Sequence, residues 1–210
     1  MIVLASVCVA SYLIGGIPFS YLAGRVTRGV DLREFGSGNL GATNTYRVLG
    51  GRVAIIVLLL DIAKGFMPVF TAMHWLPAGT IPVHWLGVAA MFFSILGHLF
   101  SPYLGFAGGK GIATSAGAFA ALAPWAFLGA FVVFALVFAA SRIVSLGSIF
   151  AALSLPVFVA LSARFGFSTF EWSVEGVSIL IMVIVLIKHR SNIQRLMSGT
   201  EKKLAKVKPE

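Results

Sequence analysis

Residues 53–73, VAIIVLLLDIAKGFMPVFTAM, form a stretch typical of a helix that crosses a lipid bilayer. A helix needs about 20 mainly apolar residues to span the hydrocarbon core. Asp61 and Lys64 carry the charges of this stretch, and their i, i+3 spacing places them on one helix face. Because a lone charge is costly inside a membrane, we expect these two side chains to pair with each other or with nearby polar loops.

Other apolar stretches flank this one, at 2–24, 84–104, 112–140, 143–162 and 174–188. Of the 210 residues, 59% are hydrophobic and 11% are charged, and the mean hydropathy is +0.97. A soluble domain is nearer half apolar and a quarter charged, whereas lipid tails accept such apolar surface without cost. The sequence therefore predicts an all-α integral membrane protein. Its single cysteine excludes an intrachain disulfide and a thiolate metal cluster.

The distribution of lysine and arginine predicts the orientation. The segment 25–52 and the tail from 188 are rich in basic residues, whereas the connections at 74–83 and 163–173 carry at most one. The positive-inside rule places the first two regions in the cytoplasm.

The formal net charge is +9, and the basic residues lie beside apolar spans. The sequence offers no base-stacking surface for a nucleic acid. We therefore expect anionic lipid headgroups and anionic substrates as partners, and no nucleic acid.

The stretch 112–140 must then cross the membrane twice, as a helical hairpin turning near Ala123-Pro124-Trp125. Its arms would be roughly 14 residues each, shorter than a usual span. We therefore expect seven transmembrane helices, with a periplasmic N-terminus and a cytoplasmic C-terminus. The chain is expected to form a single domain over 1–210, with residues 201–210 as a flexible cytoplasmic tail.

Three polar clusters interrupt the apolar pattern, and this topology places all three on the cytoplasmic side. The first cluster covers residues 35–47, FGSGNLGATNTYR. Its glycines permit a tight backbone with exposed N–H groups, its neutral side chains add donors, and Arg47 adds a planar fork suited to phosphate. The alternative is an ordinary surface turn, but the connection is far longer than a turn between helices requires.

The second cluster covers residues 97–114, GHLFSPYLGFAGGKGIAT. Glycines around Lys110 at a helix start suggest an anion nest, in which backbone N–H groups, the helix dipole and an ammonium converge. Gly111 follows Lys110, and the spacing from Gly105 is one residue short, so this is not a Walker A loop and nucleotide binding is disfavoured. The alternative is a glycine hairpin with a snorkelling lysine.

The third cluster covers residues 188–201, KHRSNIQRLMSGTE, at the end of the last apolar stretch. In a helix, His189 and Asn192 share a face at i, i+3. A basic collar behind a transmembrane helix explains Lys188 and Arg190 but not the His–Asn face. None of the four histidines has an aspartate five positions on, and no metal-binding pattern is present. Chemistry at these clusters would rely on positioning and charge stabilisation.

Taken together, the three clusters resemble the motifs of one family, the bacterial membrane glycerol-3-phosphate acyltransferases that use acyl phosphate (PlsY). The motifs are Ser37-Gly38-Asn39-x-Gly41-x-x-Asn44, Gly108-Gly109-Lys110-Gly111-x-Ala113-Thr114, and His189-Arg190-x-Asn192-Ile193-x-Arg195-Leu196 with Gly199 and Glu201. The resemblance covers essentially the whole chain. It implies a seven-helix enzyme of the bacterial inner membrane, with its active site facing the cytoplasm.

The implied reaction transfers a fatty acyl group from acyl phosphate to the 1-hydroxyl of sn-glycerol 3-phosphate, which gives lysophosphatidic acid and phosphate. The resemblance assigns catalytic roles to Ser37, Asn39, Lys110, His189 and Asn192. It assigns substrate binding to Gly41, Thr43, Asn44, Arg47, Gly108, Gly109, Gly111 and Thr114. It implies no metal and no cofactor, and the donor phosphate would accept the hydroxyl proton. Lys110 suits either substrate phosphate, and a soluble enzyme that makes acyl phosphate is a possible partner.

Two other functions use the same features. A transporter or flippase for a phosphorylated solute would need polar residues to continue through the membrane midplane. Beyond Asp61 and Lys64 the apolar stretches offer little such path. A non-catalytic membrane scaffold would not need three glycine-rich or polar clusters on one face.

Overall fold

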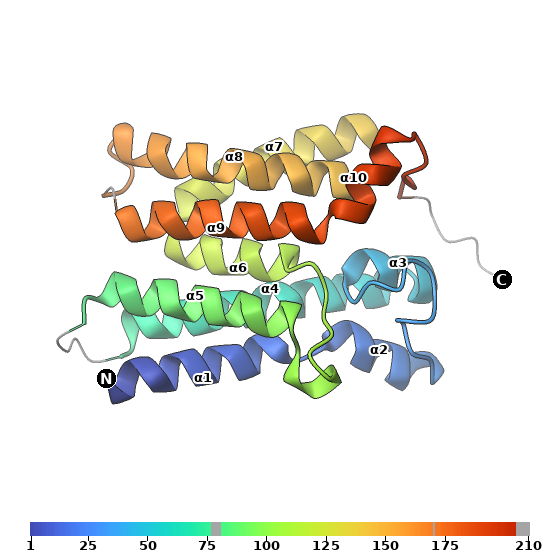
Figure 1. Ribbon diagram of the computed structural model, residues 1–210, viewed down its shortest axis with the longest axis horizontal. Helices are drawn as coiled ribbons and strands as arrows, with labels where there is room; N and C mark the ends of the chain where they lie inside the picture. The colour runs from blue at the N-terminus through green and yellow to red at the C-terminus, as the bar shows by residue number, and fades with distance from the viewer. Residues whose placement is uncertain (77–80, 170, 205–210) are drawn as a thin grey trace. The chain divides into compact units, whose positions relative to one another are not determined.

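The computed structural model describes residues 1–76, 81–169 and 171–204, and within them all regular structure is helical (Figure 1). The elements are α1 (Ile2–Gly16), α2 (Phe19–Arg28), α3 (Ala42–Leu49), α4 (Gly51–His74), α5 (Val83–Leu99), the short 3-10 helix η1 (Pro102–Leu104), α6 (Ile112–Leu122), α7 (Pro124–Ser141), α8 (Val144–Arg164), α9 (Trp172–Lys188) and α10 (Arg190–Met197).

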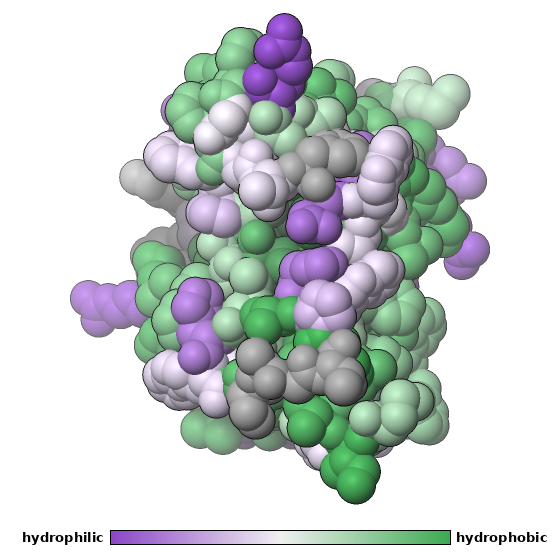
Figure 2. Space-filling model, turned by 90° about the vertical axis from the view of Figure 1, so that its left-hand side faces the viewer, coloured by the Kyte–Doolittle hydropathy of each residue, from purple (hydrophilic) through white to green (hydrophobic). Residues whose placement is uncertain are grey.

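The predicted all-α membrane class is confirmed. Among the described residues, five helical stretches are long and apolar enough to cross a bilayer, or six if the bent pair α9–α10 counts as one span. Large apolar side chains stay exposed on these helices, such as Ile55 (60%), Leu59 (59%) and Leu136 (67%). Hydrophobic side chains also make up much of the surface in Figure 2. Exposed apolar surface of this extent suits contact with lipid chains. The count of seven and the orientation stay predictions.

The first apolar stretch, 2–24, lies within one candidate span, Ile2–Arg28, but the helix of this span is interrupted. α1 ends at Gly16 and α2 begins at Phe19. Pro18 explains the break, because proline has no N–H for the helix ladder and pushes the residue before it into an extended conformation. Ile17 accordingly has φ −56° and ψ 118°. Its carbonyl is therefore available to other partners.

The stretch 112–140 breaks where the sequence predicts, but its two parts are unequal. α6 has 11 residues and ends at Leu122, and α7 has 18 residues and begins at Pro124. This replaces the expected arms of equal length. Proline is favoured at the first position of a helix, where its missing N–H has no partner in any case.

The described chain divides into two compact units, one of residues 1–118 and one of residues 119–204. In the first unit α5 packs against α1 and α4, with Ala90, Met91 and Ile95 buried on α5. In the second unit α8 packs against α7 and α9. The single domain over 1–210 stays a prediction.

The expected flexible tail over 201–210 is described only in part. The backbone N–H of Leu204 donates to the carbonyl of Arg142 at 2.8 Å, and Glu201 is hydrogen-bonded to side chains of the second unit. Residues 205–210 lie outside the described part of the chain. The first four residues of this segment are therefore attached to the helices of their unit.

Candidate active site

Asn44, in the first turn of α3, organises the loop that carries the first cluster. Its Oδ1 accepts the backbone N–H of Ser37 at 2.7 Å and the Ser37 hydroxyl at 3.1 Å. Its Nδ2 donates to the carbonyls of Leu32 (3.0 Å) and Phe35 (3.1 Å). A side-chain amide has two donors and two acceptor sites, so Asn44 uses its full capacity inside the protein. Asn44 therefore holds the loop in position, and its assignment to substrate binding stays a prediction.

The other candidates of the first cluster are more accessible. Ser37 is exposed, and Asn39, Thr43 and Arg47 are half-buried. Thr43 and Arg47 lie on one face of α3 because they are four residues apart. Gly41 precedes the helix, where unpaired backbone N–H groups and the helix dipole favour an anion. This end of α3 therefore combines neutral donors, a helix N-terminus and a guanidinium.

The second cluster folds back onto the end of α5. The Ser101 hydroxyl donates to the carbonyl of Gly16 at 2.6 Å, and the N–H of Gly109 donates to the carbonyl of His98 at 3.1 Å. Lys110 is half-buried and lies two residues before the start of α6. The chain thus places an ammonium beside the N-terminus of α6, which is the arrangement that an anion nest requires. Anion binding by this loop stays a proposal.

Gly111 and Thr114 lie on the inner side of the same loop. Gly111 is buried and has a φ of +80°, in the left-handed region that favours glycine. Thr114 is 0% exposed, and its hydroxyl has no hydrogen-bond partner among the described residues. Thr114 thus packs beneath the loop, and its place among the substrate-binding residues stays a proposal.

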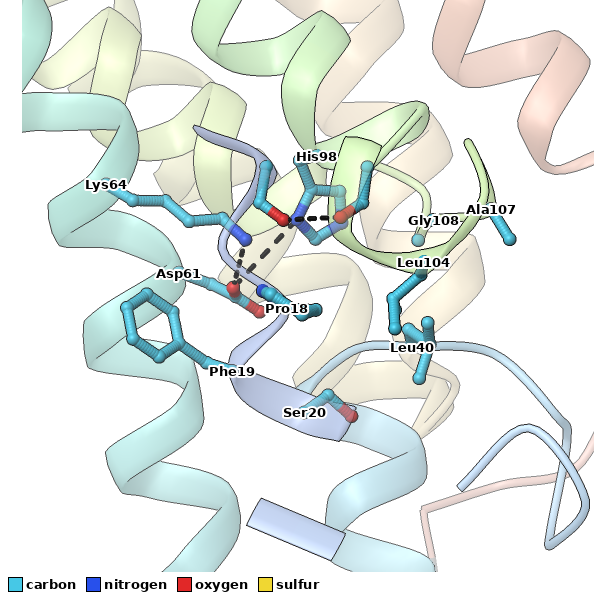
Figure 3. A pocket seen from close by; sticks show the side chains of 13 residues that line it. Pro18, Phe19, Ser20, Leu40, Asp61, Lys64, His98, Leu104, Ala107 and Gly108 are labelled. Atoms are coloured by element: carbon cyan, nitrogen blue, oxygen red, sulfur yellow. Dashed lines mark hydrogen bonds and ion pairs between the residues drawn. The ribbon is translucent and has the colours of Figure 1, made fainter. Parts of the chain in front are cut away.

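The first and second clusters meet at Gly109. A Cβ atom at this position would overlap both the carbonyl oxygen of Leu40 and Nε2 of His98. The two loops approach this closely because Gly109 has no side chain. Beneath them is a small cavity with room for about one water molecule, lined by Ser20, Leu40, Gly109 and other residues (Figure 3). Tertiary structure therefore joins two sequence clusters about seventy residues apart.

Three ionisable side chains lie beside this cavity, and we call Asp61, Lys64 and His98 the buried charged cluster (Figure 3). Lys64 Nζ is 2.8 Å from Asp61 Oδ1, so the predicted pairing is confirmed. Nδ1 of His98 is 3.9 Å from the same oxygen. Sequence reasoning assigned no site role to any of the three. A signal was present, since charged residues inside apolar spans often mark functional positions.

The third cluster belongs to the second unit. α9 and α10 are bent by 60° at His189, which is 2% exposed. Glu201 accepts hydrogen bonds from Ser145 Oγ at 2.6 Å and from Asn192 Nδ2 at 2.5 Å, and its other oxygen is 2.6 Å from Nε of Arg195. Glu201 thus fixes the side chain of Asn192. The sequence motif contained Glu201, but only the structure reveals this anchoring contact.

The pKa of the Glu201 carboxyl predicts a pH-dependent anchor. Burial raises this pKa, but the hydrogen bonds from Ser145, Asn192 and Arg195 outweigh burial and hold it below its ordinary range. A lowered folded-state pKa contributes stability above the ordinary glutamate pKa of about 4.3, and this contribution is lost as pH falls through the lowered value. We expect the protection of α10 and Leu204 against amide hydrogen exchange, measured relative to the intrinsic exchange rate at each pH, to fall in that acidic window. Glu201→Gln should remove the pH dependence, and an unchanged profile in this variant would contradict the anchor.

The described residues contain no group of three or more His, Cys, Asp or Glu side chains placed to hold a metal ion. The first unit instead presents backbone N–H groups, neutral side-chain donors and two cationic side chains, Arg47 and Lys110. The second unit presents His189 and Asn192. Such groups bind anions and stabilise negative charge that develops in a transition state.

Comparison with known proteins agrees with this chemistry. The sequence model of the family described as glycerol-3-phosphate acyltransferase matches residues 5–199. A glycerol-3-phosphate acyltransferase of Trichlorobacter lovleyi is 45% identical over 194 residues, which cover 92% of this chain and 93% of that protein. The crystal structure of PlsY, an integral membrane glycerol 3-phosphate acyltransferase, is similar in its glycerol 3-phosphate form, with a TM-score of 0.86, 34% identity and 96% of each chain covered. The lysophosphatidic acid form has a TM-score of 0.84 and 33% identity, and covers 97% of this chain and 96% of that one.

Proposed function

The chain belongs to the PlsY family of glycerol-3-phosphate acyltransferases, and we propose that it transfers a fatty acyl group from acyl phosphate to the 1-hydroxyl of sn-glycerol 3-phosphate. The products are lysophosphatidic acid and inorganic phosphate, and the reaction is the first step of phospholipid synthesis. The observation that carries this proposal is the contact of the two glycine-rich loops at Gly109. It joins a helix N-terminus with neutral donors to a loop that carries a lysine.

Both substrates carry a phosphate group, so the site needs two sets of anion-binding groups. We assign glycerol 3-phosphate to Ser37, Arg47, Lys110, His189 and Asn192. We assign acyl phosphate to Asn39, Thr43, Gly108, Gly109 and Thr114, with Gly41 and Gly111 shaping the backbone. Arg47 is suited to phosphate because its planar guanidinium offers paired donors. Lys110 suits either substrate phosphate.

The chemical step needs little from the protein beyond orientation and electrostatic stabilisation. The 1-hydroxyl oxygen attacks the acyl carbonyl carbon, a C–O ester bond forms, and the bond from that carbon to the phosphate oxygen breaks. The hydroxyl proton passes to the departing phosphate, which is both the leaving group and the base. The absence of an aspartate five positions after any histidine agrees with this substrate-assisted route.

We also propose that the site faces the cytoplasm. The segment 25–52 and the tail from 188 carry most of the arginine and lysine residues, which favour the cytoplasmic side of a bacterial membrane. Water-soluble glycerol 3-phosphate would reach the loops from that side, and the acyl chains would stay in the lipid.

The direct test is phosphate release by the purified, detergent-solubilised protein given palmitoyl phosphate, with and without glycerol 3-phosphate. We expect release to require both substrates and lysophosphatidic acid to form in equal amount. The same protein given acyl-CoA or acyl carrier protein as donor should be inactive. Turnover with those donors and not with palmitoyl phosphate would refute the proposed donor, while leaving the acyltransferase activity intact.

Substitution of two side chains tests the site assignment. Lys110→Ala and Ser37→Ala should each lower kcat/KM at least about tenfold, which is about 1.4 kcal/mol of transition-state stabilisation. Lys110→Ala removes a cation, and Ser37→Ala removes a hydroxyl that Asn44 orients. Steady-state kinetics in both substrates measure the effect, with the melting temperature as a check on folding. Kinetics near those of the parent protein in both variants would refute the assignment.

A further inference from the structure

The ion pair of α4 is a feature that stability does not explain. Asp61 is 2% exposed and Lys64 is 5% exposed, so two full charges are buried within a candidate membrane span. Burying an ion pair removes the hydration of both charges, and this cost can exceed their mutual attraction. Replacing such a pair with apolar residues is therefore often neutral or stabilising. Charges retained inside a span more often serve function. The contacts of the two side chains indicate what that function is.

Lys64 connects α4 to the break in the first span. Its Nζ donates to the carbonyl of Ile17 at 2.8 Å and lies 5.5 Å from the ring centre of Phe19. This carbonyl also accepts the N–H of Phe19 at 3.1 Å, and it can accept the Lys64 ammonium because the helix is interrupted at Pro18. Lys64 therefore holds the junction of α1 and α2 against α4.

Asp61 connects the same pair to the loop that carries Lys110. Its Oδ1 is 3.9 Å from Nδ1 of His98. The opposite edge of that imidazole, at Nε2, packs against the backbone of Gly109, and the His98 carbonyl accepts the Gly109 N–H at 3.1 Å. His98 is 8% exposed, so its ring fills a confined space between Asp61 and Gly109. Contacts thus run from the ion pair to the residue immediately before Lys110.

We propose that the buried charged cluster of Asp61, Lys64 and His98 is a positioning unit that sets the place of Gly109 and Lys110 for acyl transfer. The inference rests on the proposed function of the loop. The ion pair holds the imidazole in one orientation, and the imidazole supports the backbone of Gly109 where it meets Leu40. Loss of the pair would leave the helices packed and allow the loop to move. Small displacements of this kind reduce rate strongly, because reacting groups must be aligned.

The decisive variant is the double substitution Asp61→Asn with Lys64→Met, which removes both charges and keeps side chains of similar length. We expect kcat/KM to fall at least about tenfold while the melting temperature stays equal to that of the parent protein or rises. Lys64→Met alone should be less stable than the double variant, because it leaves the carboxylate buried without its cation. A purely structural pair would instead lower activity and melting temperature together, and that result would overturn the proposal.

A second variant tests the proposal if the double variant does not fold. His98→Phe keeps a planar ring in the same space but removes both ring nitrogens. We expect at least about a tenfold loss in kcat/KM with a melting temperature near that of the parent protein. Unchanged kinetics in a folded His98→Phe protein would overturn the proposal.

The proposed link to Lys110 can be tested by measuring the loss of kcat/KM with and without the Lys110 side chain. A purely structural role of the cluster predicts the same loss in both backgrounds. If the cluster acts by placing Lys110, the double substitution should lower kcat/KM less than about threefold in a Lys110→Ala background. The effects of substitutions at residues that act together are not additive. A full tenfold loss in that background would refute the link.

Glu175→Gln is the matched control, because it removes a partly buried carboxylate from α9 in the other unit and should leave kcat/KM unchanged. The proposed acyl-transfer function is tested separately by turnover of the parent protein. A parent protein without turnover would refute the function, whereas an active parent with unaffected variants would refute the positioning role alone.

Discussion

Gly109→Ala is expected to lower kcat/KM for acyl transfer at least about a hundredfold, because displacement of a catalytic loop by about 1 Å can cost that much. The added methyl group would overlap the carbonyl of Leu40 on one side and the imidazole of His98 on the other. The first neighbour is backbone and the second is a buried ring with little room to move, so the two loops must separate. Lys110 would move with its loop, away from the donors of the first cluster.

The measurement is steady-state kinetics with both substrates on protein shown to be folded by its melting temperature. Gly51→Ala is the matched control in the same unit, because its Cβ would lie 3.5 Å from the ring of Tyr46, an ordinary contact. We expect this control to retain the activity of the parent protein. If Gly109→Ala also retained it, contact between the two loops would not be required for catalysis.

Asn44→Asp is expected to have the largest effect on stability. The substituted carboxylate fills the same space but has no N–H groups for the carbonyls of Leu32 and Phe35. The Phe35 carbonyl keeps the N–H of Gly38 at 3.0 Å, but the buried Leu32 carbonyl loses its donor. A buried carbonyl left without a donor costs about 1–3 kcal/mol, so the free energy of unfolding should fall by roughly that amount. Activity should fall at least about tenfold as well, because the same side chain orients Ser37.

Asn39→Asp provides the stability control, since it makes the same chemical change on a half-buried amide of the same loop. Its melting temperature should stay close to that of the parent protein, whatever its effect on turnover. Thermal unfolding in detergent compares the two variants directly. A parent-like melting temperature for Asn44→Asp would mean that Asn44 does not hold the loop.

Much of the fold followed from residue type and spacing. The apolar stretches correspond to long helices because a membrane helix satisfies its backbone hydrogen bonds within a single segment. Pro124 marked the break in 112–140 because proline acts on its immediate neighbours. The same rule applied to Pro18 accounts for the break between α1 and α2, which the apolar pattern over 2–24 did not indicate.

The candidate site was predicted only in part. The Asp61–Lys64 pair followed from i, i+3 spacing, since helical geometry brings such residues together wherever the helix lies. The role of Asn44 did not follow, because its donors reach carbonyls nine and twelve residues earlier across an irregular loop. Glu201 was part of a recognisable motif, but its contact with Ser145 joins residues 56 positions apart.

Residue types and their order along the chain were enough to predict an integral membrane protein, three polar clusters and the family that those clusters resemble. These conclusions depend on composition, local periodicity and short motifs, all of which are readable along the chain. The contact of Gly109 with Leu40 and the approach of Asp61 to His98 became visible in the folded chain alone. Those contacts depend on how helices distant in sequence pack against each other, and no local pattern specifies that packing.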